Sequence, residues 1–168
     1  MASRLYSAFN GAMVTTASPV PITTSTSIKT LQQLATSSTM SLEVVEWGIS
    51  FDGSAAATPG ICELVDTVAV NSTVTAYVAA DITKVSQAAS ALASGLTLAV
   101  AGSGFTASAE GTITATRQFD TQLLPPTAPY IKQFPLERGP TMLQSEFLRV
   151  RVKFGTAINA LCYIVWAE

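Results

Sequence analysis

The stretch Phe147-Leu-Arg-Val-Arg-Val-Lys-Phe154 carries the clearest structural signal in this chain of 168 residues. Its apolar and basic side chains alternate, which is the period of a β-strand with one buried face. The side chains expected in a core are Leu148, Val150, Val152 and Phe154. The side chains expected on a solvated face are Arg149, Arg151 and Lys153.

The stretch Ala160-Leu-Cys-Tyr-Ile-Val-Trp166 follows it and is apolar at every position, hence on both faces of a strand. Such a strand lies in the centre of a sheet or is covered by another subunit. We expect the two stretches to form adjacent strands that close the sheet at the end of the chain. Neither contains a catalytic motif.

Composition favours an all-β protein. Charged residues make up 12% of the chain and apolar ones 48%, and Ser and Thr supply most of the remaining polar surface. Long helices with charged outer faces are therefore not expected. The length suits one domain with a single core. The formal charge of −2 gives no electrostatic basis for binding nucleic acid, and no apolar run is long enough to predict a membrane-spanning helix.

We divide the chain into an extended N-terminal arm, residues 1–27, and a single β-sandwich domain, residues 28–168. The arm is expected because residues 15–27 are rich in Thr, Ser and Pro, a composition typical of extended segments that pack on a neighbouring molecule. No apolar leader segment is recognisable at the N-terminus, so we expect the protein to be made in a cytoplasm. Residues 28–35 fit a helix and a strand equally well.

Further strands are expected where apolar residues alternate between turn signals. They cover residues 41–51, 60–70, 72–78, 110–119 and 130–134. In the first of these, Val45, Trp47, Ile49 and Phe51 share one expected face. One short helix is expected within residues 82–93, a flexible excursion over 95–104 and a stiff Pro-rich loop over 123–129. About eight short strands predict a two-sheet antiparallel sandwich, and we expect a jelly roll.

Two cysteines lie one hundred positions apart, at Cys62 and Cys162, each within an apolar strand-like run. A free cysteine in such a context behaves as a small apolar residue, so buried thiols are expected. A cross-strand disulfide is the alternative.

The chain contains no histidine, which excludes Ser-His-Asp and Cys-His catalytic systems and His-ligated zinc. A pair of carboxylates remains possible for glycan chemistry, but Glu43 and Glu46 fall on opposite faces of one expected strand. We therefore expect no enzyme, no cofactor and no bound metal.

Four stretches together resemble small virion proteins of tailed bacteriophages: Val44-Val-Glu-Trp-Gly-Ile-Ser-Phe-Asp-Gly53, Ile131-Lys-Gln-Phe-Pro-Leu136, Leu148-Arg-Val-Arg-Val152 and Asn159-Ala-Leu-Cys-Tyr-Ile-Val-Trp-Ala-Glu168. The resemblance implies a jelly roll, or a similar sandwich, that decorates or reinforces a capsid, commonly as a trimer. The implied partners are further copies of the chain and the lattice of a major capsid protein, with no nucleic acid and no membrane. The implied location is the virion. Residues 88–104 look like an insertion relative to such proteins.

Candidate contact residues lie on the arm, on the Pro-rich loop and just beyond that loop. They are Leu5, Tyr6, Phe9, Leu124, Pro125, Pro126, Tyr130 and Arg138. Two other functions remain open alongside capsid decoration. The chain could be a carbohydrate- or receptor-binding sandwich of a phage fibre or spike, or a jelly-roll protein that builds the shell itself.

Overall fold

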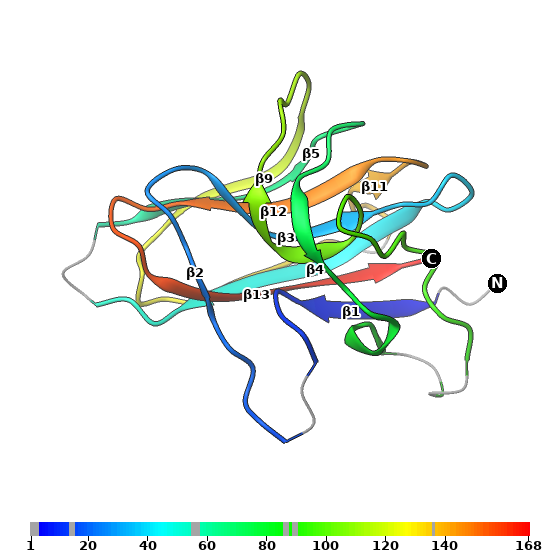
Figure 1. Ribbon diagram of the computed structural model, residues 1–168, viewed down its shortest axis with the longest axis horizontal. Coiled ribbons are helices and arrows are strands. Elements are labelled where there is room, and N and C mark those ends of the chain that lie inside the picture. Colours follow the sequence, from blue (N-terminus) through cyan, green and yellow to red (C-terminus); the bar gives the residue numbers. More distant parts are fainter. Residues whose placement is uncertain (1–3, 14–15, 55–57, 86–87, 89–90, 136) are drawn as a thin grey trace.

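Two antiparallel β-sheets pack face to face in the computed structural model (Figure 1). The structure describes residues 4–13, 16–54, 58–85, 88, 91–135 and 137–168. Sheet A contains β1 (Leu5–Phe9), β2 (Ile22–Thr23), β4 (Leu42–Phe51), β7 (Thr83–Lys84), β10 (Tyr130–Gln133), β11 (Thr141–Met142) and β13 (Asn159–Ala167). Sheet B contains β3 (Lys29–Ala35), β5 (Gly60–Asp66), β6 (Thr73–Ala76), β8 (Gly104–Ala109), β9 (Arg117–Leu124) and β12 (Phe147–Lys153). A short 3-10 helix, η1, spans Ala79–Asp81.

Eight of these strands form nested pairs, in which the first strand in sequence pairs with the last and each later strand pairs with a correspondingly earlier one from the C-terminus. The pairs are β1 with β13, β3 with β12, β4 with β10, and β5 with β9. The four-strand orders β1-β13-β4-β10 and β3-β12-β5-β9 then face each other, which is the arrangement of a jelly roll. The expected all-β antiparallel sandwich is confirmed. The described part of the chain has more than eight strands because the short strands β2, β6, β7, β8 and β11 extend or flank the two sheets.

The two C-terminal strands lie at the centre of the fold, as the two-sided apolarity of β13 predicts for that strand. β13 lies between β4 and β1, and β12 lies between β3 and β5. The four apolar side chains expected in the core, Leu148, Val150, Val152 and Phe154, are all buried. The strands are consecutive in sequence but belong to opposite sheets, so the expectation that they lie side by side in one sheet was wrong. The chain crosses from sheet B to sheet A between them.

The expected basic outer face of β12 is only partly solvated. Arg149 is completely buried. It donates from Nη1 to the Glu110 backbone oxygen at 2.9 Å and from Nη2 to the Val70 oxygen. Both partners belong to the long connection between β5 and β9, which covers this end of the strand. Arg151 forms an ion pair with Glu63 at 2.6 Å, and Lys153 remains exposed.

The β5–β9 connection differs from the sequence-based expectation in two places. The strand expected over 110–119 begins only at Arg117, because Glu110 turns toward β3 and accepts hydrogen bonds from Thr30 N at 2.6 Å and Thr30 Oγ1 at 2.5 Å. Gly111 follows with φ +71°, a conformation that favours glycine and directs the chain away from the sheet. The helix expected within 82–93 is not seen in its described residues, where β7 pairs with the edge of β1.

The N-terminal segment is not wholly an arm, because Leu5–Phe9 forms β1 within sheet A. Its side chains alternate, with Tyr6 and Ala8 buried and Phe9 exposed, as expected of a strand with one face toward the core. After β1 the chain forms a loop that extends beyond sheet A and returns as β2 (Figure 1). Residues 28–35, ambiguous in the sequence, form β3 from Lys29.

β4 contains a register shift opposite Val165 and Trp166, so Val44 and Trp47 both point inward and Val45 does not share the face of Trp47 as expected. Cys62 and Cys162 are free buried thiols, as expected, and burial raises the pKa of Cys62 to about 12. No helix in the described part of the chain is long and apolar enough to cross a membrane.

Candidate functional site

An apolar groove runs across the outer face of sheet A. Its main lining residues are Phe9, Pro129, Tyr130, Ile131, Leu161 and Tyr163, and its volume is about 240 Å³. They come from β1, β10 and β13 and from the end of the Pro-rich loop. No charged side chain is found among the described residues that line it. We call this feature the sheet A groove.

The groove exists because β13 is apolar on both faces. Cys162, Ile164 and Trp166 point into the core, where they are fully or almost fully buried. The alternate residues, Leu161 and Tyr163, therefore point outward and are half-buried. The sequence predicted a central strand or one covered by another subunit, and the structure shows the strand at the centre with its second face partly exposed.

Gly48 shapes the floor of the groove. It lies opposite Tyr163 on one side and opposite Ile131 on the other. A Cβ atom on Gly48 would lie 2.6 Å from Cε1 of Tyr163, so the absence of a side chain lets the tyrosine ring lie across the sheet. Phe9, opposite Tyr163 in β1, places its ring centroid 5.7 Å from that of Tyr163. The row of Phe9, Tyr163, Gly48 and Ile131 crosses four strands. It presents three large apolar side chains on the outer face, because only Gly48 has none.

A polar cluster borders the groove at Glu46. The Tyr163 hydroxyl donates to Oε1 of Glu46, and Gln133 Nε2 donates to Oε2 at 2.6 Å. Burial raises the pKa of Tyr163 to about 12, and the hydrogen bond to Glu46 and its negative charge add to the shift. These bonds hold the Tyr163 ring in its position along the groove wall.

Tyr130 is fixed at the rim of the groove from the opposite sheet. Its hydroxyl donates to Asp120 Oδ2 at 2.8 Å, and the buried Trp47 donates from Nε1 to the same oxygen at 3.2 Å. Asp120 belongs to β9 of sheet B, whereas Trp47 and Tyr130 belong to sheet A, so the carboxylate joins the sheets at their edge. Burial raises the pKa of Tyr130 to about 12, with the Asp120 hydrogen bond as the next cause.

The structure brings together two of the eight candidate contact residues. Phe9, 41% exposed, and Tyr130 both line the sheet A groove. Leu5 is half-buried on β1, and Pro125 and Arg138 are exposed outside the groove lining. The remaining three, Tyr6, Leu124 and Pro126, are buried within the chain.

Those three are therefore not surface contacts of the single chain. Tyr6 stacks on Trp166 inside the core, with ring centroids 5.9 Å apart. Of the five aromatic and proline candidates, Tyr6 and Pro126 are buried by packing within the sandwich. Leu161 and Tyr163 line the groove but were not among the candidates. The two-sided apolarity of β13 was the sequence feature that could have identified them.

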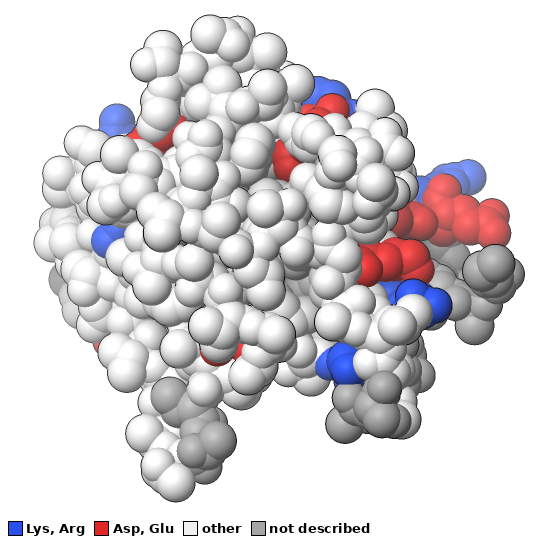
Figure 2. All heavy atoms as spheres, turned by 45° about the vertical axis from the view of Figure 1, so that its right-hand side comes forward, with Lys and Arg blue, Asp and Glu red and all other residues white. Residues whose placement is uncertain are grey.

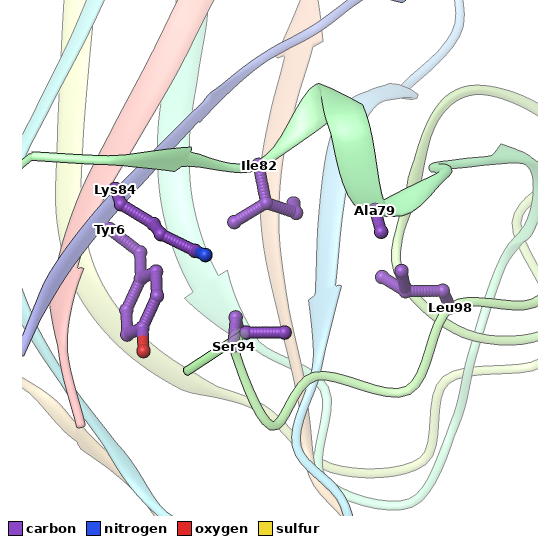
Figure 3. Close-up of a pocket in the computed structure, with 7 residues that line it drawn as sticks. Tyr6, Ala79, Ile82, Lys84, Ser94 and Leu98 are labelled. Carbon is purple, nitrogen blue, oxygen red and sulfur yellow. The ribbon is translucent and has the colours of Figure 1, made fainter. Parts of the chain in front are cut away.

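A smaller cavity lies beside the edge of sheet A. It has a volume of about 120 Å³ and is lined in part by Tyr6, Ile82, Lys84 and Ser94 (Figure 3). The Tyr6 hydroxyl donates to the Leu92 oxygen at 3.1 Å, and Lys84 Nζ donates to the Ala91 oxygen. Its polar groups bond the neighbouring loop.

Charge is scarce over much of the surface. Figure 2 shows a broad face with almost no charged side chain, and most of the visible acidic and basic side chains gather toward its right-hand margin. In the described part of the chain, no group of three or more Cys, Asp or Glu side chains is arranged to hold a metal ion.

The fold and the groove define a jelly-roll β-sandwich with an apolar contact surface on one sheet. Comparisons with protein-family models, with curated proteins and with solved structures found no match to this chain.

Proposed function

We propose that this chain is a non-enzymatic structural protein of a bacteriophage virion, a decoration or cement protein that binds the outside of the head and reinforces it. It acts as a homotrimer, with the lattice of the major capsid protein as its second partner. It is made in the host cytoplasm and works in the virion.

The observation that carries the proposal is the sheet A groove. Cores of protein interfaces are enriched in aromatic side chains and depleted in charged ones, and exposed apolar patches mark contact sites. Phe9 and Tyr163 supply aromatic surface on the outer face of the sheet, and the described lining has no charge. A glycan site needs several polar groups within its walls, and the groove presents almost none.

The resemblance to phage virion proteins coincides with the groove. Three of its four stretches include most of β4, most of β10 and all of β13, and these strands are neighbours in sheet A. The fourth contains most of β12, at the centre of sheet B. The three sheet A stretches include strands that form the floor and walls of the groove.

The test uses particles of the phage that encodes the chain. We expect purified particles to contain the protein, particles made without its gene to release their DNA at lower temperature, and added purified protein to restore the release temperature. Ile131→Asp, which places a charge in the groove, should abolish the restoration, whereas Leu123→Asp, an equally exposed site on sheet B, should not. Absence of the protein from purified particles would refute the proposal.

A further inference from the structure

The loop between β1 and β2 is exposed at its tip and fixed at its base. Figure 1 shows it extending beyond sheet A. Residues 16–20, on the returning side of the loop, are all exposed, and Val20 is 72% exposed. We call residues 16–20 the loop tip. A large apolar side chain such as Val20 gains nothing from exposure to solvent. It indicates a surface that is covered in the working assembly.

Asn10 anchors the start of the loop to β13. Its side chain donates to the Ala160 oxygen at 3.0 Å and accepts from Cys162 N at 2.9 Å, and its own N–H donates to the Cys162 oxygen at 2.9 Å. The end of the loop is held by β2, whose Ile22 pairs with Ala160. The loop is thus held at both ends, so little additional freedom is lost when its tip binds.

The chemistry of the tip matches that of the sheet A groove. Residues 5–28 contain no charged side chain, and neither does the described lining of the groove. Pro19-Val-Pro21 restricts the backbone toward the extended polyproline conformation. Aromatic-lined grooves bind such segments because the peptide is already ordered before it binds, and Phe9 and Tyr163 supply those aromatics.

We propose that the loop tip of one copy of this chain docks in the sheet A groove of a second copy. Within one chain Pro19 and Val20 are exposed, so the loop does not fill its own groove. In a ring, each copy gives its loop to one neighbour and receives a loop from the other, so that every tip and every groove is covered. The inference rests on the proposed function for the number of copies, three, but the loop-to-groove contact stands on the surfaces themselves.

The first test is the native mass by light scattering after size exclusion. The wild-type protein should be a trimer. Val20→Asp and Ile131→Asp should each weaken association by at least about 30-fold, because each places a charge in an apolar contact. The matched control is Leu123→Asp, which is 68% exposed on sheet B and should keep the wild-type mass. Circular dichroism melts show whether each variant is folded.

The second test fixes the contact between chains. A Val20→Cys variant is mixed with an Ile131→Cys variant under mild oxidation, which the buried Cys62 and Cys162 should withstand. A cross-linked dimer that forms only in the mixture supports the proposal. A monomeric wild-type protein, an unchanged mass for folded Val20→Asp, or no cross-link in the mixture would each overturn it.

The outcome is separable from that of the proposed function. If folded Val20→Asp remains trimeric and still binds particles, the loop contact is wrong and the virion role stands. If the cross-link forms but the protein is absent from particles, the contact is right and the virion role is wrong.

Discussion

Replacing Asp120 with alanine should destabilise the whole sandwich, although the residue is only half-buried. The substitution removes the acceptor of the Trp47 indole N–H, and Trp47 is completely buried. A buried donor left without a partner costs about 1–3 kcal/mol. Tyr130 also loses its acceptor, and since its hydroxyl lies near the surface this adds about 1 kcal/mol. The sum is about 2–4 kcal/mol of unfolding free energy.

For a chain of 168 residues that loss corresponds to a fall in Tm of roughly 10 °C. Urea unfolding followed by far-UV circular dichroism measures it directly. Tyr130→Phe is the matched control, because it keeps the Trp47 bond and should cost about 1 kcal/mol or less. In a double-mutant cycle with Trp47→Phe, the coupling to Asp120→Ala should be about 1–2 kcal/mol. A loss below about 0.5 kcal/mol for Asp120→Ala, or zero coupling, would show that the carboxylate does not join the sheets energetically.

Two further substitutions test the packing and the groove. Gly60→Ala should cost about 1–3 kcal/mol in urea unfolding, because its Cβ would lie 2.3 Å from the ring of buried Phe154. Gly155→Ala should cost much less, because its Cβ would lie 3.2 Å from Oγ1 of the exposed Thr58. Glu46→Gln should lower the pKa of Tyr163 from about 12 toward 10, since it removes the negative charge that opposes the phenolate, and ultraviolet titration of the tyrosines follows the change. The raised pKa contributes stability that is fully present below about pH 10 and lost as the pH rises toward 12, so this alkaline loss should be smaller in Glu46→Gln. Equal alkaline loss in both proteins would contradict that assignment.

Much of the fold follows from local patterns. The alternation in β12 identifies its core face because four apolar side chains at every second position leave only one way to bury them. The uniform apolarity of β13 likewise predicts a central strand. The stiff Pro-rich loop before Tyr130 marks where the chain passes from β9 in one sheet to β10 in the other.

Other features depend on contacts that no local pattern contains. Arg149 belongs by alternation to a solvated face, and it is buried because Glu110 and Val70, far away in sequence, cover it and bond its guanidinium. Burial lowers the pKa of Arg149 to about 10, because removing the charged guanidinium from water is unfavourable. The groove was foreseen only in part, through Phe9 and Tyr130, because its depth depends on Gly48 lying opposite Tyr163, a matter of strand register.

The edges of the two sheets are consistent with the groove as the surface we propose for association. Two short strands of the β5–β9 connection pair with long strands: β7 pairs with β1, and β8 pairs with β3. The edge strands on that side are therefore the two-residue β7 and the four-residue β6. On the other side, β10 is short and bounded by Pro129 and Pro135, and β9 carries Arg117 and Asp120. Short strands, prolines and charges each discourage pairing between sheet edges. With edge pairing discouraged on both sides, the association that we propose would use side-chain contacts on a sheet face, and on sheet A the uncharged groove offers that face.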